Sequence, residues 1–515
     1  MNKNIVICSD GTGNTAIKDR GTNVFKLYEA VDLIGHRGNP TVTRQVAFYD
    51  DGVGTEGLKL LRWLGGAFGW GLGRNVRQLY AELARVYEPG DRIFLFGFSR
   101  GAFTVRTLAG FIICCGILDR AKFRTNARLR QGVKQAYREY RRRYRTSLGS
   151  RLRRAHDPAR ADALHSRFAV VHPAYAPEGR VRIAFIGVWD TVDAVGLPID
   201  HLADVLNQLY RFKFPDLRLS PQVDKACHAI SIDDERHTFH PVMWDEEHEG
   251  QSDRIEQVWF AGVHANVGGG YPKQGMSLVS LNWMMTRAEQ CGLRFSTVDR
   301  EWWREHENVH DKLYNSRAGL SVYYRYKPRD IAGICRDHHA EPRIHFTAIE
   351  RVAQATDGYA PGNLPKNLRV VTTGPVPQDS RLAELAPTVR AALGQSLSLL
   401  DRVRGWVLAG RNAHYAFVAL SGAALYLTLS EKIAQHGWSQ ALGILVTGDG
   451  LMQLGKALLL KPWLLVLIAG FYVVGWLVRK KLDRVFSGFW HGLASSLRAI
   501  LAPPSAPVDT SRDKS

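Results

Sequence analysis

Gly97-Phe98-Ser99-Arg100-Gly101 has the spacing G-x-S-x-G, in which a serine can act as a nucleophile. The motif ends an apolar run at 93–98, which suits a strand buried on both faces, and it precedes apolar residues at helical spacing. In a strand–turn–helix context the glycines let neighbouring backbones pass closely while the serine is held in a strained turn. The alternative is a Gly/Ser turn without chemistry. The flanking elements favour a nucleophilic Ser99.

A serine nucleophile needs a base within hydrogen-bond reach and a carboxylate that orients the base. In hydrolases built on a parallel sheet, the chain order is serine, acid, histidine, and each residue follows a strand. Asp190 follows the apolar run at 181–189 and is the predicted acid. His264 precedes a Gly-rich turn, and His345 comes last in the series of apolar runs. The order favours His345 as the base and leaves His264 as a pocket residue or alternative base.

A Gly-rich turn, Ser9-Asp10-Gly11-Thr12-Gly13-Asn14, follows the first apolar run, where ligands bind in open parallel sheets. It lacks the GxxxxGK[ST] pattern of a phosphate-binding loop. We expect the amide of Gly11 or Thr12, together with the amide of Arg100 at the helix N-terminus, to stabilise an oxyanion. Asp10 is expected to line the same pocket or to serve as an alternative base. A plain tight turn is the competing interpretation.

Over residues 1–375 apolar runs alternate with helical patterns. These runs and patterns would form the strands and helices that position the candidate site residues. This predicts an α/β fold of the α/β-hydrolase kind, with a mostly parallel sheet and helices on both faces. Residues 118–180 are predicted to form a basic helical insertion, either a solvated helix or a lid whose arginines face phosphates. Residues 376–410 are predicted to be a linker, 411–502 a membrane-associated helical region, and 503–515 a disordered tail.

Two apolar stretches near the C-terminus, Ala413 to Ser430 and Pro462 to Val478, have about the length of a bilayer-spanning helix. Basic residues precede the first stretch and follow the second, as Arg479-Lys480-Lys481. Positive-inside reasoning then puts both flanks, and the catalytic domain, on the cytoplasmic side. Leu482 to Leu501 is expected to lie in the membrane interface as an amphipathic helix. The alternative is a buried helical hairpin of a soluble domain.

The net charge of +19 and the pI near 9.7 favour an anionic partner, either nucleic acid or a phospholipid surface. No nucleic-acid motif is present, so we expect no nucleic-acid partner. The six cysteines lack CxxC pairs and regular spacing, which predicts neither disulfides nor a zinc site. A zinc site formed by His237, His240 and His264 is not supported by their spacing. No metal or cofactor is expected, because serine-based hydrolysis requires none.

Several separate motifs, in the same order, resemble the α/β-hydrolase domain of type VI secretion phospholipase effectors and their uncharacterised bacterial and fungal relatives. The resemblance covers residues 3 to 350 and rests on ICSDGTGN, GFSRGAFTVRTLAG, FIGVWDTVDAVG, HAISIDDERHTFHPVMW, WFAGVHANVGGGYP, RIHFTAIERV and YAPGNLP. It implies that Ser99, Asp190 and His345 form a triad that hydrolyses phospholipid esters. It also implies a secretion partner, a cognate immunity partner and delivery to another cell. This chain departs from the family at Asn266, a pocket residue where the relatives usually have an aspartate.

We therefore expect a membrane-associated serine hydrolase that cleaves carboxylic ester bonds of phospholipids. Two alternatives remain open. The first is a membrane-tethered carboxylesterase for soluble esters. The second is a catalytically silent hydrolase fold that serves as an interaction module, which the asparagine at position 266 would favour.

Overall fold

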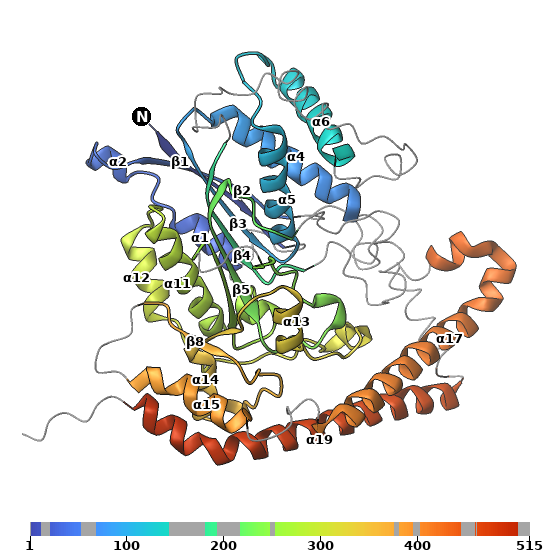
Figure 1. Cartoon of the computed structure of the whole chain (residues 1–515). Helices are drawn as coiled ribbons and strands as arrows, with labels where there is room; N and C mark the ends of the chain where they lie inside the picture. The colour runs from blue at the N-terminus through green and yellow to red at the C-terminus, as the bar shows by residue number, and fades with distance from the viewer. Residues whose placement is uncertain are drawn as a thin grey trace, which may run out of the picture.

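Eight parallel strands form one sheet at the centre of the computed structural model (Figure 1). Their order across the sheet is β2-β1-β3-β4-β5-β6-β7-β8. Their bounds are β1 Lys3–Ser9, β2 Arg44–Asp50, β3 Arg92–Phe98, β4 Ile183–Trp189, β5 Val223–Ser231, β6 Ile255–Phe260, β7 Arg343–His345 and β8 Arg369–Val371. The structure describes residues 2–11, 21–52, 68–143, 181–192, 217–247, 253–374, 381–394, 402–443, 459 and 461–502.

Helices cover both faces of this sheet, as Figure 1 shows for α1, α11 and α12 on one side and α4, α5 and α6 on the other. The α-helices are α1 Asn23–Ala30, α2 Gly35–Gly38, α4 Phe68–Val86, α5 Arg100–Cys115, α6 Asn126–Arg143, α10 His264–Gly268, α11 Gly275–Gln290, α12 Thr297–Glu305, α13 Ile331–Asp337, α14 Phe346–Ala353, α15 Leu385–Gly394, α17 Arg404–Gly443 and α19 Pro462–Leu501. Short 3₁₀ turns are η1 His237–Phe239, η2 Gly319–Tyr323, η3 Thr356–Gly358 and η4 Arg381–Glu384.

The two faces of the sheet carry separate hydrophobic cores because side chains alternate along a strand. Val6 and Phe94 pack with α1 and α11, whereas Ile5 and Ile93 pack with α4, α5 and α6. A strand buried on both faces is largely apolar, which is why residues 5–8 of β1, residues 93–98 of β3 and all of β4 appear as continuous apolar runs. The predicted α/β fold with a parallel sheet and helices on both faces is confirmed.

The basic insertion predicted for residues 118–180 is only partly described. Its first half contains α6, which packs its apolar face on α4 and α5 through Val133, Tyr137 and Tyr140. Residues 144–180 lie outside the described part of the chain, and so does the predicted tail at 503–515. The linker predicted at 376–410 contains η4 and α15, and Leu385 and Val389 of α15 are buried in the main core.

Helices α17 and α19 lie side by side along one edge of the molecule, orange and red in Figure 1. Phe417 of α17 contacts Tyr472 of α19 with ring centroids 6.3 Å apart. Within the described residues, Pro462–Leu501 is the single helix that is long and apolar enough to cross a membrane, a criterion of length and composition. Both predicted apolar stretches lie on these two helices.

The sequence pattern predicts that Leu482 to Leu501 lies in a membrane interface. In the structure, the apolar side of this C-terminal half of α19 is instead packed against the rest of the protein. Its buried stripe, which includes Leu482, Phe486 and Trp490, packs on the part of the chain that contains the sheet, and the Trp490 indole N–H donates to the Pro361 carbonyl at 2.7 Å. The apolar side of this amphipathic segment is therefore covered by protein. Most large apolar residues of the preceding half are exposed, whereas Leu464 and Val478 are buried.

Candidate active site

Ser99 stands in the tight turn between β3 and α5, as its motif predicts. Its φ of +58° is in the left-handed region that non-glycine residues rarely occupy. The turn fits because both motif glycines face backbone: a Cβ on Gly97 would lie 2.5 Å from the Gly101 carbonyl oxygen, and one on Gly101 would lie 2.0 Å from the Ser9 carbonyl oxygen. The Ser99 N–H donates to the Trp189 carbonyl at 3.0 Å, which fixes the turn to β4.

A chain of two hydrogen bonds joins Ser99 to His264 and Asp190. His264 Nε2 lies 2.8 Å from Ser99 Oγ, and His264 Nδ1 lies 2.6 Å from Asp190 Oδ2. All three side chains are buried. They follow β3, β4 and β6, whose carboxyl ends meet at one edge of the sheet. With the proton on Nδ1 donated to Asp190, the free Nε2 can accept the proton of the serine hydroxyl.

Within the hydrogen-bonded triad, the pKa shifts favour a neutral His264 and an ionised Asp190. Burial by itself would raise the pKa of Asp190, but the Arg329 guanidinium and the hydrogen bonds from His264 and Arg329 hold that pKa well below its usual range. Burial lowers the pKa of His264, and the nearby Asp190 only partly opposes the shift. At neutral pH the imidazole of His264 is therefore uncharged and able to take a proton.

Two further carboxylates hold the turn that carries His264. Asp233 Oδ2 accepts the Gly262 N–H at 2.6 Å, and Asp234 Oδ2 accepts the His264 N–H at 3.2 Å. The ring of Phe98 lies over the imidazole, with centroids 4.6 Å apart. Sequence reasoning assigned no role to Asp233 and Asp234, although the motif HAISIDDERHTFHPVMW contains them.

His345 is not near Ser99, so the prediction that it is the base is wrong. Its Nδ1 lies 2.8 Å from Thr347 Oγ1, its Nε2 lies 3.1 Å from Thr373 Oγ1, and its ring stacks on Phe260 at 4.7 Å. Phe260 is the last residue of β6, four positions before His264. His345 is thus level with the body of the sheet, whereas His264 lies beyond its edge, where the serine is.

A pH experiment follows from the buried position of His345. Burial, assisted by Arg287, lowers the pKa of His345 to about 3, whereas the unfolded chain binds this proton near the ordinary value of 6.5. The free energy of unfolding should therefore fall as the pH drops from 6.5 towards 3, because only the unfolded state takes up the proton. For His345→Gln we expect a loss between pH 7 and pH 4.5 that is about 2 kcal/mol smaller than for the wild type, measured by urea unfolding. Equal losses would contradict this assignment.

Of the three residues predicted to donate to an oxyanion, only Arg100 has its amide in a suitable place among the described residues. The Arg100 amide is at the first position of α5, directly after Ser99, where an oxyanion donor belongs. The Gly11 N–H instead donates to Asp10 Oδ1 at 2.6 Å, so this amide is already used, and the expectation for Gly11 is corrected. Thr12 lies outside the described residues. Asp10 Oδ2 also accepts a hydrogen bond from the Tyr49 hydroxyl at 2.8 Å, so the Asp10 side chain stabilises the turn in which it lies.

Asn266 lies two residues after His264 in α10 and has a structural role. Its side-chain amide donates to the Lys312 carbonyl at 3.0 Å, and its oxygen accepts the Tyr314 N–H at 3.2 Å. None of its hydrogen bonds among the described residues reaches Ser99, Asp190 or His264. An asparagine suits this place because it both donates and accepts, which an ionised aspartate could not do.

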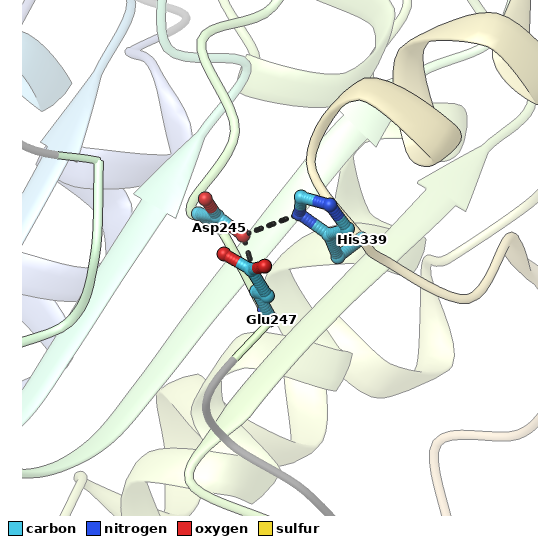
Figure 2. Close-up of side chains that lie close together, drawn as sticks. All are labelled: Asp245, Glu247 and His339. Atoms are coloured by element: carbon cyan, nitrogen blue, oxygen red, sulfur yellow. Dashed lines mark hydrogen bonds and ion pairs between the residues drawn. The ribbon is translucent and has the colours of Figure 1, made fainter.

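Among the residues that the structure describes, one group could hold a metal ion, and it lies away from Ser99. Asp245, Glu247 and His339 converge in Figure 2, with His339 Nδ1 3.0 Å from Asp245 Oδ1. Asp245 donates its N–H to Leu217, which precedes β5, so the group is at the amino ends of the strands, opposite the serine. The zinc set His237, His240 and His264 is not assembled, since both ring nitrogens of His264 are bonded to Ser99 and Asp190.

Comparison with known proteins places this geometry in a family. The family model described as "T6SS, Phospholipase effector Tle1-like, catalytic domain" matches residues 3–287. An uncharacterized protein of Saccharomyces cerevisiae, YEL023C, is 29% identical over 250 residues, and the match spans 46% of this chain and 32% of that protein.

Two solved structures are also similar. An uncharacterized protein from Pseudomonas aeruginosa is 18% identical with a TM-score of 0.33, and the match covers 78% of this chain and 62% of that one. A Tle1 effector bound to the VgrG spike of the type 6 secretion system is 16% identical with a TM-score of 0.33, and the match covers 66% of this chain and 81% of that one.

The family match spans more than half of the 515 residues and includes Ser99, Asp190 and His264. It ends before β7 and β8, and therefore before His345. The resemblance seen in the sequence motifs is thereby confirmed: the chain belongs to the Tle1-like family of type VI secretion phospholipase effectors, whose catalytic domain it contains.

Proposed function

We propose that this protein is a phospholipase that uses Ser99, His264 and Asp190 to hydrolyse carboxylic esters of membrane phospholipids. The observation that carries the proposal is the hydrogen-bonded chain from Ser99 Oγ through the imidazole to the Asp190 carboxylate. It stands on a strained turn, within the segment that matches a phospholipase family. A plain structural serine would need neither the strain nor the neutral histidine.

In the first half-reaction, Ser99 Oγ attacks the acyl carbonyl carbon while its proton moves to His264 Nε2. Asp190 stays ionised and stabilises the imidazolium that forms. The imidazolium then gives its proton to the alcohol oxygen of the lysolipid, the ester C–O bond breaks, and the acyl group remains on Ser99. We assign the Arg100 amide, at the positive end of the α5 dipole, as one donor to the oxyanion.

In the second half-reaction, water attacks the acyl carbon and His264 takes the water proton. The bond to Ser99 then breaks, the serine oxygen regains a proton from the imidazolium, and the fatty acid leaves. His264 thus begins and ends neutral, which agrees with the direction of its pKa shift.

The proposed membrane contact is the paired helices α17 and α19. Large apolar side chains along them are exposed, including Trp463, Val466, Val473 and Trp476 of α19. A continuous exposed apolar surface marks a membrane or protein interaction site. Lys480 and Lys481 follow directly and are exposed, where they would meet anionic lipid headgroups, whereas Arg479 is paired with Glu235 at 2.9 Å. We propose that these helices hold the enzyme on the bilayer, with its catalytic body on the side of the basic residues.

Family membership makes export part of the same proposal. We propose delivery into another cell by a type VI secretion system, with a spike protein as carrier and an immunity protein that protects the producing cell. The motivation is the match over residues 3–287.

Purified protein tests the function and the membrane contact together. Wild type is expected to release fatty acid from anionic phospholipid vesicles. The double substitution Val466→Asp/Val473→Asp should reduce that release at least tenfold, because each buried charge costs about 2.5–3.5 kcal/mol in a bilayer. Hydrolysis of a soluble short-chain ester should be unchanged.

Val298→Asp is the matched control, since Val298 of α12 is 75% exposed but lies on another helix. It should leave release from vesicles at the wild-type rate. Strong activity on the short-chain ester without any release from vesicles would instead indicate a soluble-substrate esterase. No activity on either substrate would contradict the proposed function.

A further inference from the structure

A fully buried arginine lies behind the acid of the site. Arg329 is 0% exposed and comes from the segment before α13, far in the sequence from the motifs that marked the serine. Its Nη1 lies 2.6 Å from Asp190 Oδ1, and its Nη2 lies 2.9 Å from Asp190 Oδ2. The contact is therefore bidentate, the geometry in which a guanidinium fixes a carboxylate most firmly.

The same guanidinium ties together the elements around the imidazole. It donates to the Ser231 carbonyl at the end of β5 and to the Phe239 carbonyl in η1. The ring of Phe239 packs edge-on against His264 at 5.1 Å. The Arg329 backbone is itself held, since Asn363 Nδ2 donates to its carbonyl at 3.1 Å. Arg329 thus fixes Asp190 from behind and fixes one wall of the His264 pocket.

We propose that Arg329 is a positioning residue for the hydrolytic reaction, which acts through Asp190 and sets the pH below which His264 stops working as a base. The proposal rests on the function assigned above to Ser99, His264 and Asp190. The negative charge of a triad acid favours the imidazolium form of its histidine. Here a cation within hydrogen-bond distance of both carboxylate oxygens offsets that charge.

Other charged groups near the imidazole do not replace this effect. Asp234 and Arg236 also face His264, but they form a bidentate ion pair with each other, with Arg236 Nη2 2.7 Å from Asp234 Oδ2. His228, which also lies near Asp190, has its pKa lowered to about 3 by burial first and by Arg106 next, so it is neutral. Asp190 is the charged group in hydrogen-bond contact with the imidazole, and Arg329 acts on His264 through that carboxylate.

The arrangement is consistent with a base that works at moderately acidic pH. With Arg329 in place, the imidazole remains neutral to a lower pH than it would beside a lone aspartate. Without Arg329, Asp190 would attract the proton on His264 more strongly, and the base would be lost at a higher pH. The orientation of the carboxylate would also loosen, which would lower kcat.

The test is the pH dependence of kcat/KM for a soluble ester, measured on the full-length protein. For Arg329→Gln we expect the acidic limb to move to higher pH by at least about half a pH unit, and kcat to fall roughly tenfold. Arg329→Lys keeps the positive charge but loses the two parallel N–H bonds. In Arg329→Lys the acidic limb of kcat/KM should therefore stay at the wild-type pH, and only kcat should fall.

Arg351→Lys is the matched control. Arg351 is equally buried, at 0% exposed, but its guanidinium bonds to the Val309 and Asp311 carbonyls and to Asp357 rather than to the site. This variant should move neither the limb nor kcat, whatever it does to stability. The rate at which a fluorophosphonate labels Ser99, followed against pH, gives the same limb without ester turnover.

An unmoved limb in Arg329→Gln would overturn the proposal. If that variant does not fold, Arg329→Lys decides, because a limb that shifts upward while the charge is kept would overturn it as well. Ser99→Ala, measured in parallel, distinguishes a failure of the proposed function from a failure of the role assigned to Arg329. Activity that survives in Ser99→Ala contradicts the proposed function itself. Activity that is lost in Ser99→Ala, together with an unmoved limb, contradicts only the role of Arg329.

Discussion

Replacing Ser99 with alanine is expected to lower the rate of ester hydrolysis at least a thousandfold. His264→Gln should lower this rate about as much, because the members of a catalytic triad act as one unit. Ser99 Oγ is the atom that His264 Nε2 contacts at 2.8 Å, so either change removes the activated nucleophile. The measurement is steady-state hydrolysis of a soluble ester, with circular dichroism to verify the fold. A soluble substrate separates the chemical step from membrane binding.

Ser277→Ala is a suitable control for the serine. Ser277 is buried in α11, and its hydroxyl donates to the Gln274 carbonyl at 2.9 Å, away from the site. This variant should keep its activity. Activity of Ser99→Ala near the wild-type rate would exclude the serine mechanism.

The second large effect is expected for Gly101→Ala. The added Cβ would lie 2.0 Å from the Ser9 carbonyl oxygen and 2.6 Å from the Asp10 carbonyl oxygen, and backbone cannot move aside as a flexible side chain can. We expect a loss of about 3 kcal/mol in the free energy of unfolding, the upper end of the usual cost of overpacking, together with lost activity, because the turn that holds Ser99 must distort. Urea unfolding and ester hydrolysis measure the two effects.

Gly422→Ala is the matched control, since Gly422 is also helical but an added Cβ there meets nothing within 4 Å. This change should leave activity intact and be neutral or stabilising by up to about 1 kcal/mol, as glycine-to-alanine changes within helices usually are. A Gly101→Ala protein as stable and active as the wild type would mean that the turn is not as tight as described.

The sequence predicts the parts of the site that depend on local pattern. Ser99 and Asp190 each follow a long apolar strand directly, so the end of the run marks the residue that emerges at the sheet edge. His264 and His345 both come after Asp190, and the preference for the last histidine in the series, His345, is misleading. The distinction is geometric: β7 has three residues, and His345 is still within it, whereas His264 is four residues past the end of β6.

The parts that sequence reasoning missed depend on contacts between distant segments. Arg329 reaches Asp190 across 139 positions, and no motif surrounds it. The glycine-rich pattern at Gly11 predicts a turn, but it does not reveal that Asp10 takes up the amide. The amphipathic stripe of α19 from Leu482 onward predicts one covered side, yet periodicity cannot tell a lipid surface from a protein surface.

The most direct test of the central claim is covalent labelling of Ser99 by a fluorophosphonate, followed by mass spectrometry in the wild type, His264→Gln and His345→Gln. If Ser99, His264 and Asp190 act together, the wild type and His345→Gln should be labelled at equal rates, and labelling of His264→Gln should be at least a hundredfold slower. The opposite result, with rapid labelling of His264→Gln and slow labelling of a folded His345→Gln, would contradict the account and make His345 the base.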